Sequence, residues 1–582
     1  MTNNKIYIIF FILFGSYVNG QTIAENRNYF GNPLYLPTEL AGTFGELRAN
    51  HFHTGIDIKT CGVEGLPIYA VADGYIGRIG ISSGGYGLVL YLNHPNGYTS
   101  VYAHLWKFNG KIAKYIKSRQ IEQEAFEIDI PLDSSLLRFK KGEIIAFSGN
   151  SGGSTGPHLH YEIRETLTEK PVNPLLFGSD IYDNIEPIMQ GIKLYPLTET
   201  SYLEVELPNG KIITVNYRQN YKFYCTKSSG GYVLKGIKKI SGYGEIGLAT
   251  RGVDFINGSS NKLGLYKIQL CVNDKAHFEK CMNKLDFSLK RFINNHCDFA
   301  EWKKTGEWYE KCFVQNNNVL PIYENYIDNG VIKLSSTEKT KITVYAIDIF
   351  SNSSSLPFTI YNVSKKNPIV SKVQDTYDTL LLYGQENIIS KPDVYIKFPL
   401  GTFYDDVEFR YTEKPITEKI YSNIHVIDNT SIPINDYFEV AVKPITLPDH
   451  LKSKACLINN ATGYIGGTWD KDMLKAKSRS LGSFYIVTDI DAPKLIPLNI
   501  KNNADLTGKA YITFKATDNL SGIATYKAYI DNKYVLLQRD AKAAQLYYEI
   551  DENCTKGTHT FKIVVSDNKS NVTSQTYSFI RR

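Results

Sequence analysis

Two histidines that alternate with apolar residues mark the stretch of this chain best suited to chemistry. The alternation begins at His158 and continues through His160 and Glu162. Because successive side chains of a strand point to opposite faces, it predicts a half-buried strand with these three groups on one face and Leu159 and Tyr161 on the other. Adjacent neutral imidazoles can serve a bound metal, one as ligand and the other as proton carrier. For an isolated His-x-His, however, a polar strand face in water is the more common interpretation.

A histidine and an aspartate four residues apart stand upstream, flanked by apolar residues. In the segment from His51 to Ile58, an extended backbone turns His53 and Asp57 to the same side. With one imidazole from the later His-x-His pair, they supply three nitrogen and oxygen ligands. Three protein ligands leave a fourth tetrahedral position open for water, which is typical of a catalytic rather than a structural zinc.

The segment from Ser100 to Leu105 contributes a third histidine. Alternation predicts Tyr102 and His104 on one face of a strand, with the apolar residues on the other. Six of the eleven histidines of the chain fall between His51 and His160. Random placement rarely concentrates them in this way, so the clustering indicates a site.

These three segments, in this order, resemble the M23 family of zinc metallopeptidases, the lysostaphin- and LytM-like peptidoglycan endopeptidases. The resemblance covers roughly residues 41–177, and its motifs are specific as a set rather than singly. They are His53-x-x-x-Asp57, Tyr102-Ala103-His104-Leu105 and Gly156-Pro157-His158-Leu159-His160-Tyr161-Glu162-Ile163, with support from residues 65–74 and 141–149. The resemblance implies that His53, Asp57 and His160 bind zinc, and that His104 and His158 are catalytic histidines that do not bind it.

The resemblance also implies a function and a cofactor. A member of this family is expected to use Zn²⁺ to hydrolyse peptide bonds in peptidoglycan through a metal-activated water. A second hypothesis is a non-catalytic protein that binds peptidoglycan or activates another cell-wall hydrolase. A third is a surface scaffold whose β modules carry adhesion. The first is favoured because all five family positions are filled.

Several neighbours of these motifs admit two interpretations. Glu162 is either a fallback base or partner of the site, or a carboxylate on the strand surface. Tyr102 either hydrogen-bonds the reaction intermediate or packs in the core, and Arg48 either meets a substrate carboxylate or forms a structural ion pair. His51 is a candidate for a supporting group of the site, and Cys61 is expected to be a small buried side chain rather than a fourth ligand.

Composition and length favour a chain of several mainly β domains. The 582 residues include 42 Tyr, with many Asn, Thr, Ile and Val, which favour strands over helices. A net charge of +6 without a long run of Lys or Arg indicates an ordinary solvated surface, and nucleic acid is not indicated. The expected fold class is an antiparallel β-sheet LytM-like peptidase domain followed by β-sandwich domains of immunoglobulin or fibronectin type.

Five segments are expected along the chain. They are a signal peptide at 1–20, the peptidase domain at 21–185, a β-sandwich with a helical insert at 186–365, a β-rich domain at 366–489 and an immunoglobulin-like sandwich at 490–582. Within the peptidase domain, an insertion at about 106–138 is expected to hold a helix over 112–125 and a strand over 126–132. It would either wall the substrate groove or act as a lid. The pattern Asp-x-x-Ser-Asn occurs twice, each time after an alternating strand, at Asp348 and at Asp567, with a looser echo at Asp518.

The start of the chain predicts export. Lys5 is followed by a short apolar run and by small or tolerated residues before a cut at Gln21. The mature protein is expected in the periplasm, secreted or at the cell surface, without a membrane span; retention as an uncleaved anchor is the alternative. No Cys lies near the cut, so a lipoprotein anchor is not supported. The eight cysteines show no zinc-ribbon spacing, and if any are joined, Cys271 with Cys281 or Cys297 with Cys312 are the nearest in sequence.

Overall fold

The structure is a computed structural model that describes residues 28–315, 317–334, 339–365, 377–416 and 418–582. The fold is mainly β, with antiparallel sheets along the whole described chain, as the composition predicts. The expected signal peptide at 1–20 lies outside the described residues. Within the described part of the chain, no helix is both long and apolar enough to cross a membrane.

Strands from all three motif-bearing segments lie in one antiparallel sheet near the start of the chain. Its strand order is β1-β4-β13-β8-β7-β6-β10, with β11 beside β6 and β14 beside β13. The strands are β1 (Leu40–Gly42), β4 (Ile56–Lys59), β6 (Gly74–Ile81), β7 (Leu88–Asn93), β8 (Tyr98–Leu105), β10 (Ile128–Pro131), β11 (Arg138–Phe139), β13 (His158–Glu165) and β14 (Pro171–Val172). A small sheet of β5 (Pro67–Tyr69), β12 (Ile144–Phe147) and β9 (Lys107–Phe108), and a hairpin of β2 (Leu47–Arg48) and β3 (His51–Phe52), complete this part.

Consecutive hairpins build the centre of this sheet. Strands β6, β7 and β8 pair in sequence order. The turn between β7 and β8 passes through Gly97, whose φ of +83° lies in the left-handed region that favours glycine. Leu90, Leu92 and Tyr102 from these strands lie in the main apolar core of this part of the molecule.

The insertion holds the helix and the strand that were expected. Helix α1 (Gly110–Glu122) begins after Asn109, whose side chain accepts a hydrogen bond from the Lys111 backbone N–H. Its Ile112 and Ile116 join the main core, and β10 pairs with β6 at the edge of the sheet farthest from β13. A short 3₁₀ turn, η1 (Pro174–Phe177), closes this region.

The next part of the chain is a large sheet with a helical insert. Its central path is β19-β18-β15-β20-β27-β26-β21-β22-β24. The strands are β15 (Ile188–Pro196), β16 (Tyr202–Glu206), β17 (Ile212–Asn216), β18 (Tyr221–Ser228), β19 (Gly231–Leu234), β20 (Lys239–Val253), β21 (Lys267–Val272), β22 (Lys275–Cys281), β23 (Glu310–Lys311), β24 (Tyr323–Tyr326), β25 (Ile332–Leu334), β26 (Lys339–Ile347) and β27 (Ser353–Asn362). The insert contains η2 (Phe287–Phe292), α2 (Ile293–His296) and α3 (Phe299–Thr305), and η3 (Asp328–Gly330) follows β24.

Two five-stranded sheets and a short strand pair follow in the part of the chain described from residue 377 to 489. One sheet has the order β29-β30-β34-β38-β37, the other β32-β33-β39-β35-β36, and β28 pairs with β31. The elements are β28 (Thr379–Leu381), β29 (Asn387–Ser390), β30 (Val394–Phe398), β31 (Val407–Phe409), β32 (Tyr411–Lys414), β33 (Ile424–Ile427), β34 (Phe438–Val442), η4 (Asp449–Lys454), β35 (Ala455–Asn459), β36 (Gly463–Tyr464), β37 (Thr468–Asp470), β38 (Met473–Ser478) and β39 (Gly482–Thr488). Both five-stranded sheets contribute to one apolar core.

The last part is a sandwich of two sheets. Their orders are β40-β42-β46-β45 and β41-β48-β47-β43-β44. The strands are β40 (Lys494–Pro497), β41 (Ala504–Asp505), β42 (Tyr511–Thr517), β43 (Ile523–Ile530), β44 (Lys533–Val535), β45 (Leu537–Asp540), β46 (Gln545–Glu549), β47 (Gly557–Asp567) and β48 (Val572–Arg581). We propose that these four groups of sheets are the four domains expected after the signal peptide.

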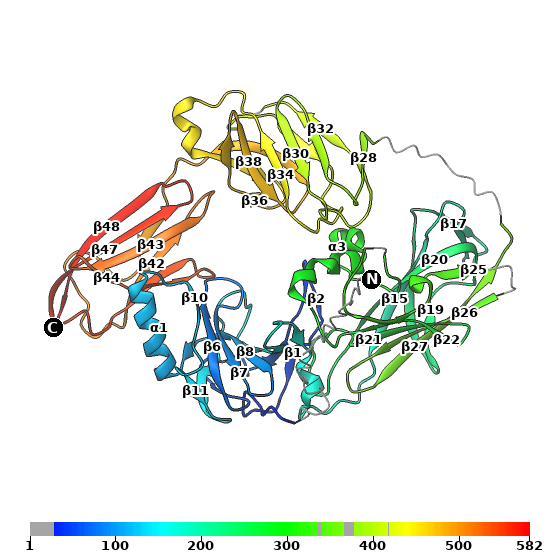
Figure 1. Ribbon diagram of the computed structural model, residues 1–582, viewed down its shortest axis with the longest axis horizontal. Helices are drawn as coiled ribbons and strands as arrows, with labels where there is room; N and C mark the ends of the chain where they lie inside the picture. Colours follow the sequence, from blue (N-terminus) through cyan, green and yellow to red (C-terminus); the bar gives the residue numbers. More distant parts are fainter. Residues whose placement is uncertain (1–27, 316, 335–338, 366–376, 417) are drawn as a thin grey trace, which may run out of the picture.

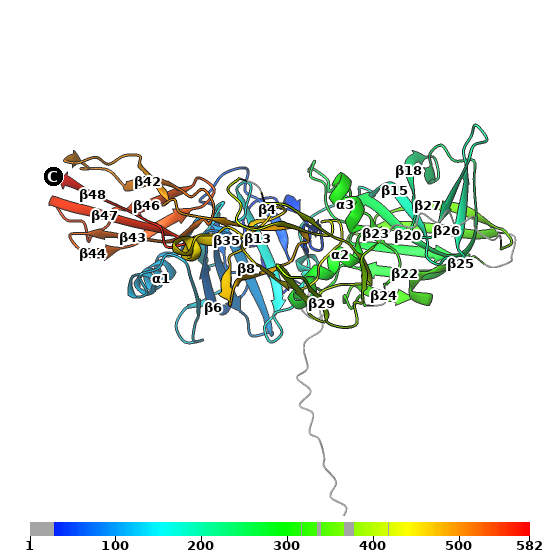
Figure 2. The same ribbon diagram turned by 90° about the horizontal axis from the view of Figure 1, so that it is seen from above.

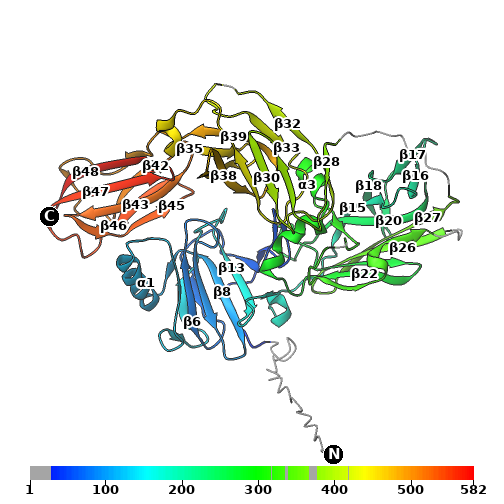
Figure 3. The same cartoon turned by 45° about the horizontal axis from the view of Figure 1, so that its top comes forward.

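The four groups are arranged around a ring, so the C-terminal sandwich returns to the insertion at about 106–138 of the first group (Figures 1 and 3). Lys117 of α1 pairs with Asp551 at 2.8 Å, and Glu124 pairs with Lys527 at 2.7 Å. Between insertion and sandwich lies a cavity of about 770 Å³, to which Trp106 and Gln120 contribute. The insertion therefore forms a wall of this cavity. Figure 2 shows the site-bearing sheet between the C-terminal sandwich at one end and the sheet of β15 to β27 at the other.

A separate apolar cluster joins the first two groups of sheets. Phe44 and Phe52 from the hairpin region pack with Met282, Leu285 and Ile293 of the helical insert. Phe52 directly precedes His53, so the second group supports the backbone at the predicted site. All eight cysteines are free thiols in the structure, and neither of the two pairs nearest in sequence is joined.

Candidate metal centre

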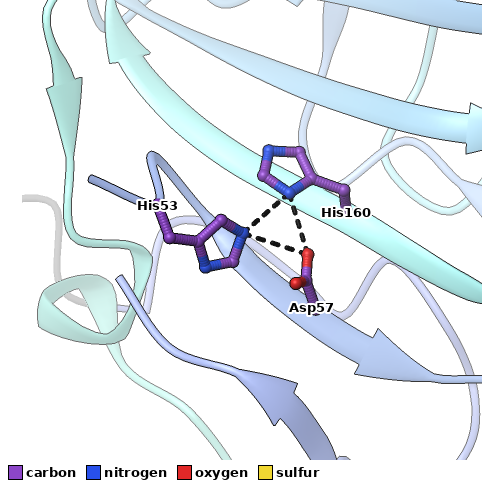
Figure 4. Close-up of side chains that lie close together, drawn as sticks. All are labelled: His53, Asp57 and His160. Carbon is purple, nitrogen blue, oxygen red and sulfur yellow. Dashed lines mark hydrogen bonds and ion pairs between the residues drawn. The ribbon is translucent and has the colours of Figure 1, made fainter. Parts of the chain in front are cut away.

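Three of the predicted residues meet in one buried cluster. His53, Asp57 and His160 are 2%, 6% and 3% exposed. The distance from His53 Nε2 to His160 Nδ1 is 2.9 Å, and Asp57 Oδ1 lies 3.0 Å from the first atom and 2.8 Å from the second. Figure 4 shows the two rings and the carboxylate converging, with dashed lines marking these contacts.

The backbone brings these residues together through strand pairing and one glycine. In the register of β13 and β4, His160 lies directly opposite Asp57. His53 reaches the cluster from the loop between β3 and β4, where Gly55 packs against β13 so closely that a Cβ would lie 2.4 Å from the Tyr161 carbonyl oxygen. The extended segment predicted from His53 to Asp57 is therefore interrupted, yet the two side chains still meet.

The hydrogen bonds on the far side of each ring determine which nitrogen carries the proton. His53 Nδ1 lies 2.8 Å from the Thr43 carbonyl oxygen, to which it must donate. His160 Nε2 lies 2.8 Å from a carboxylate oxygen of Glu162 and donates to it in the same way. Each neutral ring therefore turns a lone pair toward the other ring and toward Asp57. Three lone-pair atoms at this separation repel one another unless a proton or a metal ion lies among them, and two imidazole nitrogens with one carboxylate oxygen form a donor set that fits a metal ion.

Protonation at the cluster follows from burial and from the neighbouring charges. Burial lowers the pKa of His53 to about 4, so its imidazole is neutral near pH 7. Burial by itself would raise the pKa of Asp57, but His53, His158 and His160 lower it well below its ordinary value. Burial likewise opposes a charge on His160, but its hydrogen bonds to Asp57 and Glu162 raise its pKa to about 9 in the metal-free protein. A metal must therefore displace a proton from His160 at neutral pH.

His104 reaches the cluster by a route that simple alternation does not predict. Tyr102 and His104 were expected on one face of β8, but Tyr102 points into the main core, fully buried, whereas His104 lies beside the other histidines. Its ring centroid is 4.9 Å from that of His158 and 5.8 Å from that of His160. The reason is the backbone of His104, whose φ of +58° is left-handed. This irregular residue turns the side chain to the opposite face.

The two remaining imidazoles are oriented alike. His104 Nδ1 lies 2.9 Å from the Ser151 carbonyl oxygen, and His158 Nδ1 lies 2.8 Å from that of Gly156. Each ring donates from Nδ1, so Nε2 carries the lone pair. His158 Nε2 is 3.5 Å from Asp57 Oδ1. Burial, together with the nearby His160 and His158, lowers the pKa of His104 to about 3, which keeps it neutral.

Glu162 supports the cluster rather than facing water. It was interpreted as a strand-surface carboxylate or as a partner of the site, and the structure decides for the partner, because it is fully buried. Besides His160, it accepts hydrogen bonds from the Thr54 and Tyr86 hydroxyls at 2.8 and 2.6 Å. Arg164 Nε donates to its other oxygen at 2.6 Å. A buried carboxylate of this kind orients the ring that it contacts.

Arg48 holds the second oxygen of Asp57. Its guanidinium donates to Asp57 Oδ2 at 2.6 Å and lies 3.5 Å from Glu46. Of the two interpretations of Arg48, the structural ion pair is therefore the one present. Burial, opposed in part by hydrogen bonds from Thr43, raises the pKa of Glu46 to about 7.

Other residues considered from the sequence lie outside the cluster. The Tyr102 hydroxyl accepts from the Val71 backbone N–H at 3.1 Å, so its role is packing. His51 is exposed and lies 2.9 Å from the Ala49 carbonyl oxygen. Cys61 is exposed in a turn, which contradicts its expected burial. Alternation places Glu162 on a strand face but does not reveal that it is buried. Nothing in the sequence pattern indicated that Tyr86 bonds Glu162.

Two family profiles match the chain. Peptidase family M23 matches residues 51–121, which include His53, Asp57 and His104. A Zu5-like domain matches residues 378–489.

Individual proteins match the same N-terminal part. The DD-carboxypeptidase/endopeptidase Mpg of Neisseria meningitidis is 34% identical over 162 residues, which are 27% of this chain and 31% of Mpg. The chain thus spans about three tenths of the length of that relative. Lipoprotein NlpD of Yersinia enterocolitica is 31% identical over 116 residues, 20% of this chain and 93% of that protein.

Among solved structures, a mutant catalytic domain of the prophage-encoded M23 protein EnpA from Enterococcus faecalis is 26% identical, with a TM-score of 0.19; the match covers 26% of this chain and 98% of that domain. The family profile matches the segment that carries three of the site histidines and aspartates, and the match to NlpD, at 31% identity, covers nearly the whole length of that relative. This chain belongs to peptidase family M23, a family of metallopeptidases.

Proposed function

We propose that this protein is a zinc-dependent endopeptidase that hydrolyses peptide bonds in peptidoglycan. The observation that carries the proposal is the convergence of possible ligand atoms from His53, Asp57 and His160, with the imidazoles of His104 and His158 beside them. A purely structural cluster would not need five groups of this kind on one side of a sheet.

His53, Asp57 and His160 would hold the metal. Two nitrogen donors and one carboxylate oxygen leave a position open, as catalytic zinc sites require. When bound, zinc supplies the Lewis acidity that makes water a nucleophile near neutral pH and polarises the peptide carbonyl. Arg48 and Glu162 hold Asp57 and His160 in the orientation that keeps their lone pairs in the site.

His104 and His158 would move the protons. Because each ring donates from Nδ1 to a backbone carbonyl, its Nε2 is free to accept a proton from the attacking water. The proton can then pass to the nitrogen of the leaving peptide. Positioned acid and base groups of this kind contribute roughly 10² to 10⁴ in rate.

Peptidoglycan is proposed as the substrate from the relatives. One is named a DD-carboxypeptidase/endopeptidase, and a peptidoglycan DD-endopeptidase, ShyC of Vibrio cholerae, is 27% identical over 158 residues. A peptidase acting on the cell wall has to be exported, which is consistent with the signal peptide expected at residues 1–20. We therefore propose a periplasmic, secreted or cell-surface protein.

Two histidine variants test the assignment of roles. In residues 21–582 purified with zinc, His160→Ala should lose the metal, whereas His104→Ala should keep it and lose muropeptide release from purified peptidoglycan. His450→Ala is the matched control, because His450 is an exposed histidine outside the site. Equal loss of zinc in both site variants would contradict the roles. Stoichiometric zinc with no release by the parent protein would favour the non-catalytic binder or activator.

A further inference from the structure

Two clusters of three aspartates lie outside the histidine cluster, and each includes an aspartate from a junction between consecutive groups of sheets. Asp183, Asp254 and Asp348 bring one carboxylate oxygen each within 4.8 Å of one another, and Asp489, Asp518 and Asp567 do the same. Asp183 precedes β15, and Asp489 lies between β39 and β40. The other four aspartates lie at or just after the ends of β20, β26, β42 and β47.

The two clusters repeat the same short sequences. In each, the junction aspartate is followed four residues later by proline, the second aspartate four residues later by glycine, and the third is the start of Asp-x-x-Ser-Asn. The segments are Asp183 to Pro187 and Asp489 to Pro493, Asp254 to Gly258 and Asp518 to Gly522, and Asp348 to Asn352 and Asp567 to Asn571. The group of sheets that starts at β15 and the C-terminal sandwich therefore carry the same arrangement of aspartates.

The hydrogen bonds repeat as well. Asn352 donates from Nδ2 to Asp348 Oδ2 at 2.7 Å and to the Asp183 carbonyl oxygen at 3.3 Å. Asn571 donates to the corresponding Asp567 oxygen at 2.7 Å and to the carbonyl of the junction aspartate, Asp489, at 3.0 Å. In both clusters the asparagine thus ties the junction to the hairpin without neutralising any carboxylate.

Buried oxygens at both clusters lack a partner. Asp254 is 5% exposed and Asp489 2% exposed, and the Oδ1 atom of each has no hydrogen-bond donor. Asp518 Oδ1 and the Ser521 hydroxyl are in the same condition. The hydrogen bonds that the described residues donate to the carboxylates of Asp183, Asp348, Asp489, Asp518 and Asp567 come from backbone N–H groups and asparagine amides, which are uncharged. Buried carboxylates that are neither paired nor fully hydrogen-bonded are strongly unfavourable unless they coordinate a metal or take up protons.

We propose that each cluster binds one Ca²⁺ ion. The candidate ligands are all oxygens, which selects a hard cation and disfavours zinc or copper. Ca²⁺ exchanges its coordinated water molecules for several carboxylate oxygens and tolerates an irregular geometry. Mg²⁺ keeps several of its coordinated water molecules, for which a buried cluster of three carboxylates leaves little room. Because the junction aspartate and the aspartates at two strand ends bind the same ion, Ca²⁺ restricts the motion of the junction segment relative to the group of sheets that follows it.

Calcium binding can be measured on residues 21–582, stripped of metal on a chelating resin and then reloaded with one equivalent of zinc. Calorimetric titration of the parent protein with CaCl₂ should show two calcium sites. Asp254→Asn and Asp518→Asn should each retain one calcium site, and the double variant should retain none. Asp505→Asn, which changes an exposed aspartate in the last sandwich, should keep both. Titration with MgCl₂ should give no comparable heat.

Thermal unfolding separates a metal site from a purely structural one. Replacing a repelling carboxylate by an amide should leave the calcium-free variants at least as stable as the calcium-free parent, while abolishing their stabilisation by calcium. A lower midpoint for the variants in both conditions would overturn the proposal. So would a parent protein that takes up no calcium, because the carboxylates would then be sharing protons.

Discussion

Replacing Glu162 by Gln should weaken metal binding although Glu162 does not contact the metal position. The Glu162 carboxylate accepts from His160 at one oxygen and from Arg164 at the other. A glutamine carries a donating NH₂ at one of these two places. If the NH₂ faces His160, the ring must take its other tautomer and put a proton on Nδ1, the atom that faces Asp57. If the NH₂ faces Arg164, it meets the Arg164 Nε–H, and two hydrogen-bond donors then point at each other with no acceptor between them.

The size of the effect follows from burial. Loss of a partner that orients a metal-binding histidine typically weakens metal affinity by about 10- to 100-fold, or about 1.4 to 2.7 kcal/mol. Arg164 is 4% exposed and would lose its charged partner, and unpairing a buried ion destabilises a protein by about 3–5 kcal/mol. Tyr86 and the rings of Tyr91 and Phe287 still contact the guanidinium, so the lower end of this range is expected.

The assay is competition for zinc against a chromophoric chelator, with thermal unfolding run in parallel. Glu165→Gln is the matched control, because Glu165 lies on the same strand but is only half-buried and pairs with Lys284. Loss of such a surface pair changes stability by less than about 1 kcal/mol and should leave zinc affinity intact. Zinc affinity of Glu162→Gln within twofold of the parent would refute the tautomer reasoning.

Three further predictions concern other parts of the peptidase region. Tyr102→Phe should retain turnover, because the hydroxyl bonds the Val71 backbone inside the core, and a large fall in kcat would contradict this. Phe52→Ala should lower the free energy of unfolding by about 3–5 kcal/mol, measured by urea denaturation, because it opens the cluster shared with the second group of sheets; a value below 1 kcal/mol would argue against that interface. Burial lowers the pKa of His94 from 6.5 to about 4, so the neutral ring contributes stability that is present above pH 6.5 and is lost as the pH falls through about 4. His94→Gln should therefore reduce acid destabilisation between pH 6.5 and 4 by about 3 kcal/mol, and an unchanged pH dependence would contradict the assignment.

The sequence was sufficient to locate the candidate site and the fold class. The alternation through His158 and His160 follows from local backbone geometry, because the side-chain period of a strand is set within the strand itself. The four-residue spacing of His53 and Asp57 pointed to the right pair, although the backbone between them is not a continuous strand. The helix and strand of the insertion, and the hairpins β6 to β8, have equally local signals in apolar periodicity and glycine turns.

Tertiary structure alone decided which side chains join those residues. His104 turns into the site through a left-handed backbone that alternation cannot reveal, and Glu162 becomes a buried partner because β13 lies between β4 and β8. Phe52 is buried in an apolar cluster that includes Ile293, more than two hundred residues away in the chain. Burial and backbone irregularity depend on segments that are distant in sequence, whereas periodicity reports only on near neighbours. The sequence therefore indicated the candidate ligands but not the residues that support them.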